Sequence, residues 1–296
     1  MQPTRVFSNK PLTPDPVSSP RIHRLTAWDG IVLTVREWGN GTDGRPLLCL
    51  PGIVRTGLDF AAVAAALGDG RRVIAPDYAG RGASGRARKV ERYAAEACVR
   101  DVLDICAALH VHGAVAIGTS FGGLLCMGIA AAQPSLLHAV VLNDIGPEIG
   151  GDGGEFVRRF VATDPALPDL TACVAWLRRT LPPMSLHSNA DWQEIARLTY
   201  APALDGRWHP VWDTRIAHLL TARVPDLWSL FRGMAHLPLL LVRGEESNIL
   251  LQDTVARMRA ARPDMDVVSL AGIGHAPTLA EPAVAAALAE FLDRVG

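Results

Sequence analysis

One serine lies between two glycines in the stretch Gly118-Thr119-Ser120-Phe121-Gly122. Four apolar residues, 114–117, precede this stretch, and an apolar run of helical length, 124–132, follows it. That order predicts a buried strand, a very sharp turn and a helix, with the serine hydroxyl exposed at the carboxyl end of a sheet. The helix N-terminus beneath it would favour developing negative charge. We therefore expect Ser120 to be a nucleophile.

A serine hydroxyl is a weak nucleophile unless a base takes its proton. His275 is the best candidate for that base, because it follows the last expected strand, 266–270, in the small-residue loop Gly272-Ile273-Gly274-His275-Ala276. Small neighbours would let the loop bring the imidazole to Ser120. The pair predicts nucleophilic catalysis of acyl transfer.

Strands and helices alternate on both sides of Ser120. The expected strands are 21–27, 31–38, 46–50, 72–75, 114–117, 139–142, 237–242 and 266–270, and the expected helices include 58–67, 93–110, 254–261 and 281–295. This alternation predicts an α/β fold with a doubly wound, mostly parallel sheet. In such sheets, sites lie outside the carboxyl ends of the strands, which is where each polar motif of this chain falls.

The pattern changes between residues 150 and 232, where prolines separate helical segments and no apolar strand is evident. We interpret this stretch as a helical cap over the carboxyl edge of the sheet, inserted into a core of 21–149 and 233–296 that follows a loose arm, 1–20. Five of the seven tryptophans lie in the cap. These tryptophans would either pack in the small core of the cap or line an apolar cavity. The expected substrate contacts among them are Trp176, Trp208 and Trp212.

The overall composition makes several classes of function improbable. With 29 basic and 30 acidic residues, the formal net charge is -1, which gives no sign of nucleic acid or an anionic membrane as partner. Residues 1–20 do not resemble a signal peptide, and no apolar run reaches the ~18 residues of a membrane span. The five cysteines lack metal-site spacing and indicate a reducing compartment. We expect a cytoplasmic monomer or homodimer without metal or organic cofactor.

These motifs together resemble the α/β-hydrolase fold superfamily over residues 21–150 and 235–296, with the insertion at the family's cap position. The segments that carry the resemblance are Leu50-Pro51-Gly52-Ile53, Asp77-Tyr78-Ala79-Gly80-Arg81-Gly82-Ala83-Ser84, 118–123 and 272–275. They follow the family's order of oxyanion loop, elbow and histidine. The resemblance implies that Ser120 is the nucleophile and His275 the base, and that the backbone N–H groups of Ile53 and Phe121 form the oxyanion hole.

The acid of the expected triad departs from the family's usual pattern. The family usually has an aspartate at the end of the segment that is Arg243-Gly244-Glu245-Glu246-Ser247-Asn248 in this chain, and here that residue is Asn248. An asparagine can orient a histidine but cannot stabilise imidazolium by charge. Asp144 lies twenty-four positions after Ser120, the spacing at which some haloalkane dehalogenases of this fold carry their acid. We favour Asp144. One alternative is that Glu245 or Glu246 moves to the histidine and serves as the acid. The other is that Asn248 indicates a weakened or deliberately substituted enzyme.

The expected protein is a capped serine hydrolase that cleaves an apolar ester, lactone or thioester through an acyl-enzyme. One alternative keeps Ser120 and His275 but makes or breaks a carbon–carbon bond. A second alternative, favoured by Asn248, is a ligand-binding or receptor-like protein on the same fold. A haloalkane dehalogenase or epoxide hydrolase is disfavoured, because those enzymes carry an aspartate where Ser120 stands.

Overall fold

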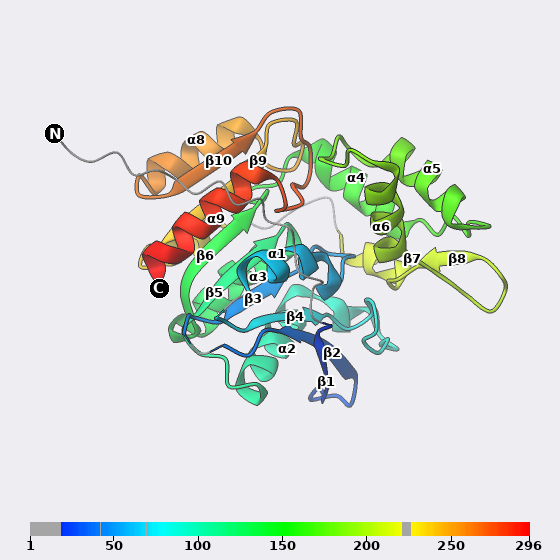
Figure 1. Ribbon diagram of the computed structural model, residues 1–296, viewed down its shortest axis with the longest axis horizontal. Coiled ribbons are helices and arrows are strands. Elements are labelled where there is room, and N and C mark those ends of the chain that lie inside the picture. The colour runs from blue at the N-terminus through cyan, green and yellow to red at the C-terminus, as the bar shows by residue number, and fades with distance from the viewer. Residues whose placement is uncertain (1–18, 42, 69, 221–225) are drawn as a thin grey trace.

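An eight-stranded sheet forms the centre of the computed structural model, which describes residues 19–41, 43–68, 70–220 and 226–296 (Figure 1). The strands lie in the order β1-β2-β4-β3-β5-β6-β9-β10. β2 pairs antiparallel with both β1 and β4, and the other neighbours are parallel. Their bounds are β1 Arg21–Thr26, β2 Val32–Trp38, β3 Leu47–Leu50, β4 Val73–Asp77, β5 Ala114–Thr119, β6 Leu137–Asn143, β9 Leu239–Gly244 and β10 Asp266–Leu270. The predicted α/β fold is therefore confirmed, while nearly all of the expected arm, 1–20, lies outside the described residues.

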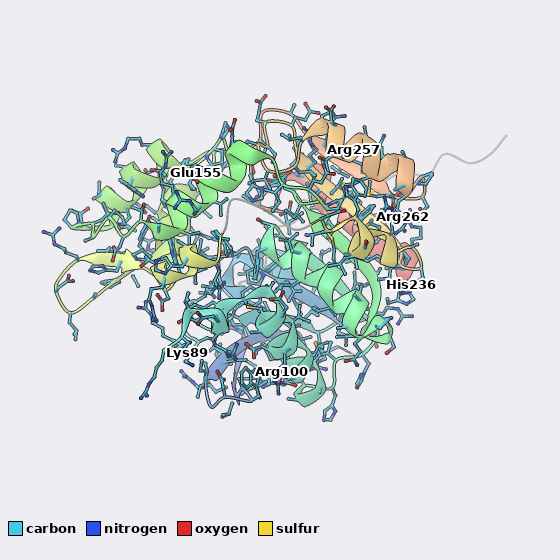
Figure 2. All side chains as sticks on the ribbon, turned by 180° about the vertical axis from the view of Figure 1, so that it is seen from behind. Lys89, Arg100, Glu155, His236, Arg257 and Arg262 are labelled. Carbon is cyan, nitrogen blue, oxygen red and sulfur yellow. The ribbon has the colours of Figure 1, made fainter. Side chains whose placement is uncertain are left out.

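Helices cover both faces of the sheet because the side chains of each central strand alternate between two apolar clusters. Val115 and Ile117 of β5 pack with α1 (Ala61–Leu67) and α9 (Pro282–Val295). Ala114 and Ala116 face the other cluster, which includes residues of α2, α3 and α8. The bounds of these are α2 Ala95–Ala108, α3 Phe121–Ala132 and α8 Gln252–Ala261, and the short 3₁₀ turns are η1 Gly57–Phe60, η2 Val90–Tyr93 and η3 Pro134–Leu136. Figure 2 views the α2 and α3 side, where Arg100 of α2 is labelled.

The elements inserted after β6 lie at the carboxyl edge of the sheet (Figure 1), and the part up to η4 is called the cap below. Its elements are α4 Gly151–Ala162, α5 Leu170–Thr180, α6 Asn189–Thr199, β7 Tyr200–Pro202, β8 Trp208–Pro210 and η4 Thr214–Leu219. The helix that follows, α7 Trp228–Gly233, packs against α3 on the face of the sheet. Side-chain caps fix two helix starts: Asp169 accepts from the amide of Ala172, and Ser188 forms a capping box with Asp191.

The β7–β8 hairpin is an element that the sequence analysis missed, because its three-residue strands contain no apolar run and each ends at a proline. The Asp205-Gly206 dipeptide in its turn is the signal that could have indicated it. Within the described residues, no helix combines the length and the apolar character that crossing a bilayer demands.

Candidate active site

Ser120 occupies the tight turn between β5 and α3. Its backbone has φ 51° and ψ −116°, a sparsely populated conformation for a residue with a side chain. The turn closes because Gly118 and Gly122 lack side chains: a Cβ on Gly122 would overlap the carbonyl of Leu50, and one on Gly118 would press on Gly122. The amide of Ser120 donates to the carbonyl of Asn143 at 2.9 Å, which ties the turn to β6. Strand, turn and helix therefore fix the backbone of Ser120 at the carboxyl end of β5.

Ser120, His275 and Asp144 form a continuous hydrogen-bonded chain. The Nε2 atom of His275 lies 2.8 Å from the Ser120 Oγ, and its Nδ1 lies 2.8 Å from the Asp144 Oδ2. The other oxygen of Asp144 accepts from the Gly244 amide at 3.1 Å. With the Asp144 carboxylate facing Nδ1, that nitrogen carries the proton and Nε2 is left to accept from the serine.

The acid reaches the histidine because β6, which it follows, lies directly beside the elbow strand β5. Asp144 is fully buried and has a left-handed backbone, φ 55°, with its amide donating to Val242 at 2.8 Å. The family's usual acid position follows β9, which is one strand farther from β5 than β6 is. Asn248 is exposed there, and its carbonyl lies against Gly150 at the start of the cap. Glu245 and Glu246 are exposed as well.

Asn143 is a buried residue that sequence reasoning did not single out. Its Nδ2 donates to the Thr119 Oγ1 at 3.1 Å and to the carbonyl of Pro277 at 2.9 Å. These contacts join the strand before Ser120 to the loop that carries His275. Its place immediately before Asp144 was the only signal in the sequence that could have pointed to it.

The loop after β3 lies beside the elbow because β3 and β5 are parallel neighbours, with Leu50 level with Gly118. Ile53 lines the same cavity as Ser120. Phe121 is the first residue of α3, so its N–H belongs to the group of helix N-terminal donors that have no partner within the helix. The two backbone groups assigned to the oxyanion hole thus come from neighbouring segments, and their role stays a prediction.

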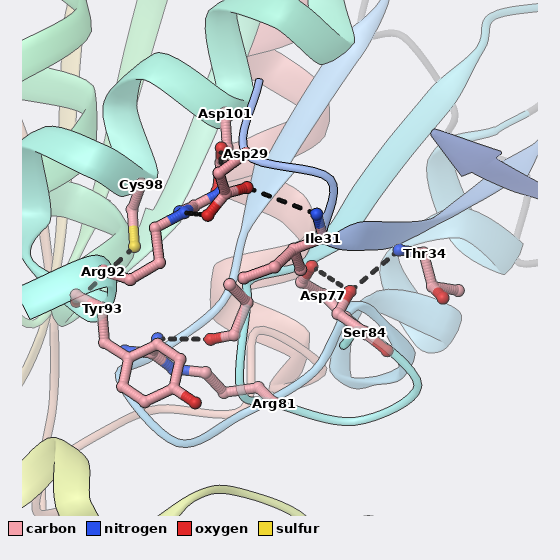
Figure 3. A network of polar contacts seen from close by, with 11 residues as sticks. Asp29, Ile31, Thr34, Asp77, Arg81, Ser84, Arg92, Tyr93, Cys98 and Asp101 are labelled. Atoms are coloured by element: carbon pink, nitrogen blue, oxygen red, sulfur yellow. Dashed lines mark hydrogen bonds and ion pairs between the residues drawn. The ribbon is translucent and has the colours of Figure 1, made fainter. Parts of the chain in front are cut away.

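A buried arginine supports the loop after β3. The Arg81 Nε donates to the carbonyl of Ile53 at 2.8 Å, and its guanidinium lies 5.6–5.8 Å from the ring centres of Tyr78, Tyr93 and Phe121. Burial lowers the pKa of Arg81 from its ordinary value. Figure 3 shows Arg81 beside Tyr93, in a view that also includes Asp77 and Ser84.

The hydrogen bonds of Asp77 and Ser84 hold the segment that carries Arg81. Asp77 accepts from Arg36 at 2.5 Å and from the amide of Ala83 at 2.9 Å. The Ser84 hydroxyl donates to the Asp77 carbonyl at 2.7 Å and accepts from the amide of Thr34 at 2.8 Å (Figure 3). The glycine-rich segment 77–85 therefore has a structural part in positioning the loop after β3.

A cavity of about 210 Å³ opens above Ser120 and His275, between the core and the cap. Its walls are mainly apolar. The cap contributes side chains from α4, α5 and α6 and from the segment between α5 and α6. These are Phe156, Val157, Phe160, Val161, Leu177, Leu181, Met184, Ile195, Leu198 and Thr199.

The three tryptophans expected to contact substrate are not among the residues that line this cavity. Trp212 is buried in the core of the cap, where its Nε1 donates to the Val161 carbonyl at 2.9 Å. Trp208 pairs through its backbone with Leu167, and Trp176 lines a second cavity. We therefore withdraw the assignment of Trp176, Trp208 and Trp212. The wall is formed by Phe156 and Phe160 instead.

A signal for that wall was present in the sequence. Phe156, Val157, Phe160 and Val161 recur at the spacing of one helical face, so α4 has a single apolar stripe. A buried indole with its N–H satisfied inside the cap has no comparable pattern, because its partner is a backbone carbonyl far away in sequence.

Comparison with known proteins agrees with this architecture. The sequence pattern described as the alpha/beta hydrolase fold matches residues 45–282, and the chain belongs to that family. By family, therefore, it is a hydrolase of the alpha/beta fold.

Two similar curated proteins cover almost the same span. A 3-hydroxybutyrate-oligomer hydrolase of Cupriavidus necator is 32% identical, over 88% of this chain and 92% of that protein. A 2-(acetamidomethylene)succinate hydrolase of Mesorhizobium japonicum is 30% identical, over 89% and 92%. Among solved structures, an alpha/beta hydrolase from Novosphingobium aromaticivorans superposes with a TM-score of 0.88 at 34% identity, covering 93% of this chain and 99% of that one.

Proposed function

We propose that this protein is a serine ester hydrolase that cleaves short, largely apolar esters through an acyl-enzyme. The observation that carries the proposal is the Ser120–His275–Asp144 chain, with two contacts of 2.8 Å, on the wall of an apolar cavity. Such a chain activates a hydroxyl towards a carbonyl carbon.

In the proposed mechanism, the ester carbonyl lies above Ser120 and His275 takes the serine proton as Oγ attacks. The Asp144 carboxylate stabilises the imidazolium that forms. The N–H groups of Ile53 and Phe121 donate to the developing oxyanion. His275 then protonates the leaving alcohol, and a water molecule, activated by the same histidine, releases the acid and restores Ser120.

The choice of an ester is supported by the relative at 32% identity, whose name denotes hydrolysis of an oligomer of 3-hydroxybutyrate. The small, apolar cavity is compatible with short acyl groups. Carbon–carbon cleavage uses the same Ser120 and His275, but we favour the ester on the strength of this relative.

Asn248 favours the interpretation as a binding protein, because it leaves the family's usual acid position without a carboxylate. The contact of 2.8 Å between Asp144 and His275 supports a triad with Asp144 as its acid, and with it the ester hydrolase. A complete hydrogen-bonded chain supports turnover.

The proposal is tested with p-nitrophenyl butyrate in a stopped-flow experiment. We expect a burst of p-nitrophenolate approaching one equivalent per chain when deacylation is the slower step, followed by steady turnover. Ser120→Ala, which removes only the attacking oxygen, should show neither phase. A wild-type protein that releases no p-nitrophenolate above the buffer rate, or a Ser120→Ala variant as fast as the wild type, would contradict the proposal.

A further inference from the structure

Arg55 places a cationic side chain in the wall of the otherwise apolar catalytic cavity. Among the lining residues of the described chain it is the only lysine or arginine. It follows Ile53 by two positions, and its stem packs beside Gly52, where an added Cβ would lie 3.2 Å from the Arg55 Cγ. Its side chain is 22% exposed. The guanidinium therefore lies at the cavity, close to the oxyanion loop.

Two residues hold the guanidinium in place. Asp59 accepts from its Nε at 2.6 Å and from its Nη2 at 2.7 Å, a bidentate pair along one edge. From the cap, the Thr199 Oγ1 lies 2.6 Å from Nη1. The Thr199 hydroxyl donates its own hydrogen to the carbonyl of Ile195 at 2.6 Å, so it accepts from Arg55. Orientation is thus fixed from both core and cap.

This arrangement leaves donors available to a ligand. A guanidinium has five N–H groups. Three of them bind Asp59 and Thr199, and within the described residues one N–H on Nη1 and one on Nη2 have no protein partner. Burial would lower the pKa of Arg55, but the neighbouring Asp59 carboxylate outweighs that effect and raises it, so the side chain remains a cation.

An ion pair in an apolar wall is not explained by stability. The side chains of Arg55 and Asp59 are 22% and 24% exposed, and a partly exposed ion pair four residues apart contributes little to stability. All of the groups involved, Arg55, Asp59 and Thr199, line the cavity that also holds Ser120. Binding of a polar group of the substrate would explain why an ion pair is present in this wall.

We propose that Arg55, oriented by Asp59 and Thr199, binds a carboxylate at the end of the substrate away from the scissile ester. The substrate class is thereby narrowed to esters that carry a free carboxylate, such as an acylated hydroxy acid. This inference rests on the proposed ester hydrolysis and assigns Arg55 a role in specificity. The two remaining N–H groups would donate charge-assisted hydrogen bonds to the carboxylate oxygens.

The test compares two substrates that differ only in that end group: 3-(butyryloxy)butanoate and its neutral amide, 3-(butyryloxy)butanamide, with butyrate release measured for both. We expect the wild type to favour the carboxylate in kcat/KM by about tenfold or more, mainly through KM, as the loss of charged hydrogen bonds would give. Arg55→Gln should bring this ratio close to one.

Two further variants make the result specific. Arg55→Lys keeps the charge but not the bidentate geometry, so it should retain part of the preference. Arg197→Gln removes an exposed arginine of α6 that does not line the cavity, and the ratio should then stay at the wild-type value.

The inference is overturned if the wild type does not distinguish the two substrates, or if Arg55→Gln leaves the preference intact. Equal losses on both substrates would assign Arg55 a structural role and also overturn it. The p-nitrophenyl butyrate burst separates this failure from that of the proposed function: a wild-type burst without a carboxylate preference contradicts only the role of Arg55.

Discussion

At the scale of single residues, the placement of Asp144 decides how the site would work. It follows the strand beside the elbow strand, and its carboxylate faces His275 from a fully buried position. In the proposed mechanism, a carboxylate there would fix the histidine tautomer and stabilise the positive charge that forms during attack. Asn248 is exposed beside the start of the cap, and among the described residues the Nδ1 of His275 is bound by Asp144 instead.

Asp144→Asn should therefore lower kcat for p-nitrophenyl butyrate by about 10³- to 10⁴-fold, because the amide favours the wrong tautomer and carries no charge. Asn248→Asp should change kcat little. Steady-state kinetics of both variants provide the measurement. The opposite pair of results, a silent Asp144→Asn with a strongly activated Asn248→Asp, would show that the acid belongs at position 248.

At the scale of elements, the elbow requires strand and helix to approach at backbone distance. Gly122→Ala would force the new methyl group into the carbonyl of Leu50, so β3 and α3 must separate. We expect the free energy of unfolding to fall by about 2–3 kcal/mol, as for other overpacked sites. Urea unfolding curves measure it. Gly233→Ala is the matched control, since its Cβ would meet no atom within 4 Å and should be neutral or slightly stabilising. Equal stability of Gly122→Ala and the wild type would count against this packing.

Elements that depend on local pattern could be predicted from the sequence, and those that depend on distant partners could not. The elbow, the histidine loop and the α/β fold follow from apolar runs that end in small or polar residues. The spacing from Ser120 indicated Asp144. The prediction that tryptophans of the cap contact substrate was wrong, because burial of Trp212 depends on its tertiary partners Val161 and Phe160. The placement of Arg55 in the cavity wall could not be predicted, because its partner Thr199 is 144 positions away in the sequence.

At the scale of the whole molecule, cap and core share one apolar cluster, which contains Trp212 of the cap and Leu125 of the core. Hydrogen bonds of Asp213 to Gly80 and Tyr93 also join cap and core, and we call this group the polar junction. The amide of Asp213 donates to the Gly80 carbonyl at 2.8 Å, and its carboxylate accepts from the Tyr93 hydroxyl at 2.8 Å. Burial raises the pKa of Asp213, but hydrogen bonds from Arg215 and Tyr93 outweigh it and bring the pKa to about 2.

This junction should make the stability depend on pH. Because the pKa of Asp213 is lower in the folded chain than the ~3.9 of a free aspartate, its stabilisation is complete above about pH 4 and disappears as the pH falls through about 2. Asp213→Asn should thus lower the free energy of unfolding by about 1–2 kcal/mol at pH 7, and by much less near pH 2.

Denaturant unfolding at pH 7, 4 and 2.5 would measure this difference. Asp293→Asn, at an exposed position on α9, is the control and should show no such trend. A difference between wild type and Asp213→Asn that stays constant over the whole pH range would contradict the assignment.

The central claim is that Ser120 is a nucleophile activated by His275, and covalent labelling tests it most directly. The protein is treated with a fluorophosphonate, and the adduct is located by intact-mass and peptide mass spectrometry. We predict one label per chain, on the peptide that contains Ser120, with no label on Ser120→Ala and much slower labelling of His275→Ala. Labelling of Ser120→Ala at the wild-type rate, or an adduct on another residue, would contradict the claim.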